Sequence, residues 1–163
     1  MSPTHAEPVL RPPRHLVSPR AVRYWTAKAA LAWLLPLAGA TAAALAGPVP
    51  GWVPAAVAVL AAAHLAVMPR WRYRVHRWEA TPEAMYLQYG WFSQEQRIAP
   101  LSRIQTVDSH RGPLEALFDL ANVTVTTASA AGPLRVHGLD RTEAQRLVDR
   151  LTEAAQRGED DAT

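Results

Sequence analysis

Apolar residues follow three different patterns along the chain. Residues 29–69 form an almost unbroken apolar run, residues 71–138 alternate between apolar and polar side chains, and residues 140–157 repeat apolar side chains every three to four positions. A long apolar run is typical of membrane helices, alternation is typical of strands, and the third spacing is typical of an amphipathic helix. The pattern predicts an α+β chain, in which a two-helix transmembrane hairpin precedes an antiparallel β-barrel or sandwich capped by a C-terminal helix.

The apolar run divides at GPVPG, residues 47–51. This segment predicts a short turn between two membrane helices at about residues 25–46 and 50–69. Roughly 20 helical residues cross a hydrocarbon core of about 30 Å, so each half is long enough to span it. Tryptophans near the predicted span ends are expected at the membrane–water interface, as is usual for this residue. They are Trp25, Trp52 and Trp71.

Charge is segregated along the chain, although the net charge is only +3. Residues 1–28 hold five basic side chains and one acid, residues 29–69 hold no charge, and residues 70–77 hold four arginines. Basic flanks with an uncharged turn place both termini in the cytoplasm of a multi-pass protein of the cell membrane, and this arrangement does not indicate nucleic-acid binding. The cations expected at the membrane interface are Arg20, Arg23, Lys28, Arg70, Arg72, Arg74 and Arg77.

The remaining segments complete the expected domain plan. Residues 1–24 are basic and rich in proline, with no hydrophobic period, so they are predicted to be disordered. Residues 70–157 are predicted to form the cytoplasmic domain, and residues 158–163 an acidic tail. Asp140 is expected to cap the C-terminal helix and Gly158 to end it.

His64 is the only titratable side chain in the apolar run, residues 29–69. Ionisable groups inside a membrane are candidates for function. We expect no polar partner for His64 in either span, so the favoured interpretation is a neutral histidine that reaches the interface near the cytoplasmic end.

The alternating region predicts several strands and one helical corner. A strand is expected to begin directly at the membrane and to cover residues 71–80. Within residues 101–110 the alternation is imperfect, so either a bulge or burial on both faces is expected there. Leu114, Leu117 and Phe118 have helical spacing and are expected to plug the open side of the barrel. The other predicted strands are two within residues 84–99, with Met85, Leu87, Tyr89, Phe92 and Ile98 as their apolar positions, one at 123–127 and one at 134–138.

Residues 97–129, RIAPLSRIQTVDSHRGPLEALFDLANVTVTTAS, followed by Gly138-Leu139 before a helix, resemble the bacterial PH-like domain of the YdbS-like membrane proteins. The resemblance implies a strongly bent, seven-stranded antiparallel barrel plugged by its C-terminal helix. The family usually has glycine where this chain has Asp119, a residue that tolerates a left-handed backbone. The positions that carry the resemblance are Pro100, Arg103, Ile104, Gln105, Gly112, Pro113, Leu114, Leu117, Phe118, Gly138 and Leu139.

Candidate chemistry is sparse. The chain has no cysteine, its six histidines have no metal-site spacing, and Asp108-Ser109-His110 cannot form a triad because neighbours in a strand face opposite sides. We therefore expect no catalytic, metal or cofactor site. The expected function is a membrane-tethered scaffold for interaction or oligomerisation. The alternatives are sensing of lipid headgroups at the inner leaflet and an accessory role in a transport, export or stress-resistance complex.

The expected partners follow from the same features. They are the lipid bilayer and either a second copy of the chain or another protein, for which the family resemblance suggests a paired PH-domain membrane protein. No nucleic acid is expected.

Overall fold

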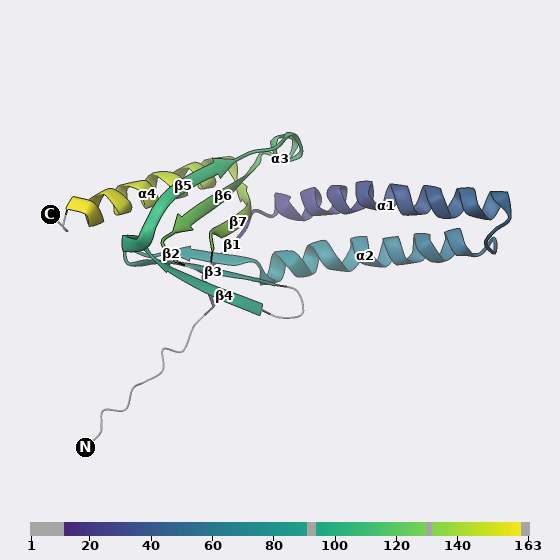
Figure 1. Ribbon diagram of the computed structural model, residues 1–163, viewed down its shortest axis with the longest axis horizontal. Helices are drawn as coiled ribbons and strands as arrows, with labels where there is room; N and C mark the ends of the chain where they lie inside the picture. Colours follow the sequence, from purple (N-terminus) through teal and green to yellow (C-terminus); the bar gives the residue numbers. More distant parts are fainter. Residues whose placement is uncertain (1–11, 91–93, 130–131, 161–163) are drawn as a thin grey trace, which may run out of the picture.

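Two long helices extend side by side from one end of a small β-sandwich in the computed structural model, which describes residues 12–90, 94–129 and 132–160 (Figure 1). The observed class is α+β, as predicted. The elements, in chain order, are β1 (His15–Leu16), α1 (Arg20–Ala46), α2 (Val53–Val75), β2 (Arg77–Ala80), β3 (Ala84–Gly90), β4 (Gln94–Pro100), the 3-10 turn η1 (Leu101–Arg103), β5 (Ile104–His110), α3 (Pro113–Leu117), β6 (Leu120–Thr127), β7 (Leu134–Asp140) and α4 (Arg141–Asp160).

The strands form two antiparallel sheets with the orders β1-β2-β3-β4 and β5-β6-β7. Strands that follow each other in the chain are neighbours in the sheet, which is the usual result of short connections. Helix α4 packs against β5, β6 and β7 and covers the sandwich on that side. The β5–β6 register shifts between Ile104 and Thr106, so the predicted bulge is confirmed.

The alternation in the sequence reports which side chains face the core. Met85 and Leu87 of β3 are fully buried, as are Val123 and Val125 of β6. Leu147 and Leu151 of α4 close the core from the other side, and the helical spacing had placed both on the apolar face. Ile98, an apolar position of the predicted strands, is 45% exposed on the edge strand β4. Phe92 lies outside the described residues.

The segment after the second apolar run is helical rather than extended, which corrects the strand predicted at 71–80. Helix α2 runs through Pro69 to Val75, and β2 begins only at Arg77. Five residues of alternation are also compatible with a helix, so periodicity could not decide between the two. Continuing the helix carries its last two turns past the apolar run and against β3.

The N-terminal segment is ordered from residue 15 onward, so the prediction of disorder over residues 1–24 is wrong for residues 15–24. Strand β1 pairs with β2, and α1 already begins at Arg20. Val17, Ala21 and Trp25, spaced four residues apart, are all buried in the core of the sandwich. Trp25, expected at the membrane interface, is only 4% exposed. Residues 1–11 lie outside the described part of the chain.

The α3 corner separates three apolar residues that the sequence had grouped together. Leu114 and Phe118 pack against the core, and the Phe118 ring contacts Tyr24 edge to face at 6.2 Å. Leu117 instead is 79% exposed, so it does not plug the sandwich as predicted. Asp119 has a φ of +56°, which fits the expectation that it replaces glycine in a left-handed conformation.

The C-terminal helix is longer than predicted. Asp140 directly precedes α4, and its side chain accepts hydrogen bonds from Ser18 and Arg20, so its capping of α4 stays a prediction. Helix α4 continues through Gly158 to Asp160. A single glycine disfavours a helix by only about 1 kcal/mol and need not end it. The predicted acidic tail therefore begins inside α4, and residues 161–163 lie outside the described part.

Both long helices are apolar and long enough to cross a membrane, and their apolar stretches are almost entirely uncovered by the rest of the protein. They pack against each other along their length. Trp33 of α1 donates a hydrogen bond from Nε1 to Nδ1 of His64 in α2 over 2.9 Å. The prediction that His64 has no polar partner in the spans is therefore wrong, and the pair links the two helices.

Candidate functional site

A basic cleft lies where the end of α2 meets the sandwich. It has a volume of about 450 Å³. Its α2 wall is formed by Met68 and Arg72, with His76 just beyond the helix. These residues are four apart and share one helix face because an α-helix repeats every 3.6 residues. From β7, Arg135 and His137 are two apart and so project from one face of the sheet. The lining residues are Met68, Arg72, His76, Tyr89, Gly90, Pro133, Arg135 and His137.

The cleft is positively charged. Arg72 and Arg135 are its cations, and none of its described lining residues is acidic. The Arg72 guanidinium lies 4.6 Å from the centre of the Trp25 ring, a cation–π contact that holds the half-buried side chain in place. Arginine presents several donors in a fixed plane, which suits it to phosphate and carboxylate oxygens. The arrangement therefore favours an anionic ligand.

Histidines form the inner part of the cleft. His76 is 4% exposed, and its ring lies 6.3 Å from His137 and 6.2 Å from Trp25. Burial, and secondarily the charges of Arg72 and His137, lower the pKa of His76 to about 4. Burial also lowers the pKa of His137, with Arg72 and Arg135 adding to the effect. Both rings are therefore neutral near pH 7, and the positive charge comes from the arginines.

His76 also has an unused polar atom. Its Nε2 is buried and has no hydrogen-bond partner among the described residues. Buried polar groups are usually paired, and exceptions mark strain or a place for a partner. We take this atom as a second sign that the cleft accommodates a polar ligand.

The lowered pKa of His76 predicts a loss of stability in mild acid. The unfolded histidine has a pKa of about 6.5 and the folded one about 4, so the unfolded state binds more protons between these values. The free energy of unfolding should fall as the pH drops from 6.5 to 4, by at most about 3 kcal/mol. Urea unfolding of the detergent-solubilised protein at several pH values measures this. In a His76→Gln variant the slope should be shallower, and an unchanged slope would contradict the assignment.

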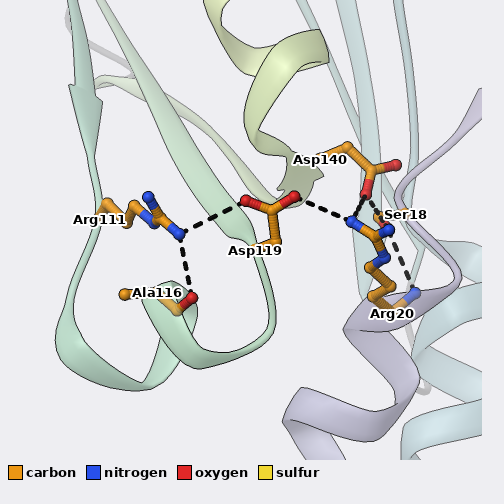
Figure 2. A network of polar contacts seen from close by, with 6 residues as sticks. All are labelled: Ser18, Arg20, Arg111, Ala116, Asp119 and Asp140. Atoms are coloured by element: carbon orange, nitrogen blue, oxygen red, sulfur yellow. Dashed lines mark hydrogen bonds and ion pairs between the residues drawn. The ribbon is translucent and has the colours of Figure 1, made fainter.

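A polar network fixes the start of α1 to the sandwich (Figure 2). Arg20 bridges Asp119 at 3.0 Å and Asp140 at 3.4 Å. The Ser18 hydroxyl donates to Asp140 over 2.9 Å and accepts a hydrogen bond from the backbone N–H of Arg20, the first residue of α1, over 3.2 Å. Arg111 donates to Asp119 and to the carbonyl of Ala116. Exposed ion pairs contribute about 1 kcal/mol or less each, so the network mainly sets orientation.

The first turn of α1 also touches β7 directly. The Ser18 N–H donates to the Gly138 carbonyl over 2.9 Å. A Cβ placed on Gly138, which has a φ of +79°, would lie 2.8 Å from the Cβ of Ala21. Only glycine allows the helix and the strand to approach this closely. The sandwich is therefore joined to both long helices. The start of α1 packs against Gly138, and the end of α2 meets the sandwich at the cleft.

The cations expected at the membrane interface have different surroundings. Arg72 lines the cleft, and Arg20 is engaged by carboxylates rather than free for lipid. Arg70 and Arg77 donate to the backbone carbonyls of Ala66 and Arg74. The side chains of Arg23, Lys28 and Arg74 are exposed.

The sequence did not identify His76, Arg135 or His137, the other basic side chains of the cleft besides Arg72, as site residues. The spacing of Met68, Arg72 and His76 is visible in the sequence, but it has meaning only if α2 continues past the apolar run. The expected strand at 71–80 concealed it. Arg135 and His137 alternate in β7, but nothing in the sequence places β7 beside α2.

The positions that carried the family resemblance mark corners of the fold. Gly112 and Pro113 begin α3, Gly138 receives the first turn of α1, and Leu139 is buried in the core. Pro100 precedes η1 and Arg103 is its last residue, and Ile104 and Gln105 begin β5. None of these positions is among the described residues that line the cleft.

Comparisons with known proteins agree with this architecture. The family model for the bacterial PH domain matches residues 29–155. The UPF0699 transmembrane protein YdbS of Bacillus subtilis (strain 168) is 33% identical over 95 residues, which is 58% of this chain. The match also spans 58% of that relative's length. No solved structure matches the chain significantly.

Proposed function

The chain belongs to the bacterial PH domain family, and on that premise we propose that this membrane protein is non-catalytic and binds the phosphate of an anionic lipid headgroup in the cleft beside α2. The observation that carries the proposal is the convergence of Arg72 and Arg135 in a cleft whose described lining has no acid. The comparisons support a membrane protein with a bacterial PH domain, whereas the ligand is inferred from the residues of the cleft.

The position of the cleft relative to the membrane supports this ligand. The proposal has α1 and α2 crossing the cell membrane and both termini in the cytoplasm, because arginines flank both helices and the turn between them has none. Met68 lies near the end of the apolar run, and Arg72 follows four residues, about 6 Å along the helix, later. A cleft that begins at this level opens into the headgroup layer, where lipid phosphates lie. Its apolar wall at Met68 then faces the upper part of the acyl chains.

Removing the cleft arginines should weaken binding of anionic lipid. Each cation near an anionic surface contributes about 1 kcal/mol. In an Arg72→Gln, Arg135→Gln double variant, the affinity for anionic lipid should therefore fall by roughly tenfold or more. Native mass spectrometry of the full chain, with phosphatidylglycerol competing against phosphatidylcholine, measures the retention.

The matched control replaces two arginines on the same stretch that do not line the cleft, Arg74→Gln and Arg77→Gln. This pair removes the same charge and should keep most of the preference. Equal losses in both double variants would show that the arginines act only as general surface charge. An unmodified chain that does not distinguish the two lipids would overturn the headgroup proposal.

A second candidate function is a scaffold for another protein, and the open edge of β4 favours it. Among the described strands, β4 pairs only with β3, and Ile98 on it is 45% exposed. Unpaired strand edges accept strands from partner chains. The partner would be a second copy, a paired PH-domain membrane protein, or a subunit of a transport, export or stress-resistance complex.

Site-specific crosslinking tests the scaffold function. A photo-reactive residue in place of Ile98 should capture a defined partner in cells, while one in place of exposed Arg150 on α4 should not. A chain that remains monomeric after mild extraction and captures nothing from Ile98 would contradict this function. The result is independent of lipid retention.

A further inference from the structure

The α3 corner presents an exposed apolar face. In the described part of the sandwich, the large apolar side chains recorded as exposed are Ile98, at 45%, and Leu117, at 79%. Pro113 and Ala116, on the same short helix, are also exposed. Leu117 is therefore the most exposed large apolar side chain in the described part of the sandwich, and it does not stand alone.

Acidic groups near this face are turned away or neutralised. Glu115, the only acid of α3, accepts hydrogen bonds from the hydroxyl of Tyr24 over 2.8 Å and from the side chain of Asn122 over 3.1 Å. Asp119 is paired with Arg20 and Arg111. Because these arginines are paired with carboxylates, the cation left at the edge of this small apolar surface is the exposed Arg23.

The corner lies beside the point where α1 leaves the sandwich. Leu117 and Phe118 line a shallow hollow together with Arg20, Arg23 and Asp119. Figure 1 shows α3 at the same end of the sandwich from which both long helices extend. Arg23 precedes the last cation before the apolar run, Lys28, by five residues, or about 7.5 Å along the helix. Headgroup layers add about 5–7 Å on each side of the hydrocarbon core, so with Lys28 at the core boundary the hollow beside Arg23 lies near the outer edge of the headgroups.

We propose that the α3 corner is a third contact of this protein with the bilayer, in which Leu117 inserts among the headgroups and Arg23 faces lipid phosphates. The occupant is the anionic membrane surface because the apolar face lies beside the exposed Arg23 and beside the start of α1, the helix that enters the membrane. An apolar side chain next to a cation is a combination that holds interfacial segments on a membrane. The contact fixes the tilt of the sandwich about the hairpin and does not depend on the ligand of the cleft.

The absence of cysteine makes this contact directly measurable. A nitroxide attached to a Leu117→Cys variant in nanodiscs that hold one copy of the full chain reports depth through its collisions with oxygen, which concentrates in lipid, and with a water-soluble nickel complex. The label at Leu117 should show a several-fold higher ratio of oxygen to nickel collisions than a label in an Ile98→Cys variant. A Leu35→Cys variant, in the middle of α1, supplies the lipid-exposed reference.

The outcomes separate the possible occupants. A ratio at Leu117 equal to that at Ile98 would overturn the proposal. So would protection from nickel that appears only in nanodiscs with two copies, since the occupant would then be a second chain. Replacing half of the anionic lipid by neutral lipid should lower the ratio at Leu117 but not at Leu35, as expected for a contact that arginine helps to hold. Variants of the cleft arginines should leave the ratio unchanged, so the two proposals can fail separately.

Discussion

Replacing Trp25 with alanine is expected to lower the free energy of unfolding of the sandwich by about 3–5 kcal/mol, the usual range for a large aromatic removed from a core. Trp25 is 4% exposed, and its ring lies near both the His76 ring and the Arg72 guanidinium. The variant would lose the buried area and the cation–π contact that positions Arg72. Pulse proteolysis of the detergent-solubilised protein across a urea series measures the change.

Trp52→Ala is the matched control for this substitution. Trp52 precedes α2 at the far end of the hairpin and is 68% exposed, so its removal should change the stability of the sandwich little. Equally small losses of stability for the two substitutions would mean that both tryptophans are interfacial, as the sequence alone predicted. That result would also contradict the packing of Trp25 in the core of the sandwich.

A Gly138→Ala substitution is expected to destabilise the protein by about 2–6 kcal/mol, the sum of backbone strain and overpacking. At a φ of +79° alanine is strained, and its Cβ would lie 2.8 Å from the Cβ of Ala21. Because Ala21 belongs to the first turn of α1, relieving the clash requires the helix to move away from β7. The same urea series measures the loss, and cleavage in the segment before α1 should become faster.

Gly132→Ala separates the two causes. Gly132 has the same φ of +79°, but no atom lies within 4 Å of the Cβ that alanine would add. This variant should show the strain alone, so its loss of stability should be clearly smaller. If the two variants lose the same free energy, the close approach of α1 to Gly138 contributes nothing.

The family and most strands were accessible from the sequence because they rest on local information. Alternation at Met85, Leu87, Val123 and Val125 reported burial correctly, since one face of each strand meets the core. The left-handed backbone at Asp119 was expected from a residue type that tolerates it. The imperfect alternation of apolar and polar residues after Leu101 corresponds to a shift in the β5–β6 register.

Predictions failed where local patterns had two interpretations. The arginine-rich stretch after the second apolar run alternates like a strand, but α2 continues through it to Val75. Leu114, Leu117 and Phe118 share a helical stripe, but a single turn of helix cannot bury all three, and Leu117 faces outward. In the proline-rich N-terminus, the four-residue spacing of Val17, Ala21 and Trp25 is too short a pattern to predict that these residues belong to the core.

The sequence by itself determined the class of this protein: two apolar helices, an antiparallel sandwich, a closing helix and the family to which they belong. These features follow from short-range periodicity and from an ordered set of turn residues. Only the tertiary structure decided what lies beside what. It turned Trp25 from an interfacial residue into a core residue, engaged Arg20 with two aspartates, and brought Arg72 and Arg135 together from positions 63 apart in the chain. The physical reason is that a cleft is made by contacts between distant segments, and local sequence patterns carry no information about those distances.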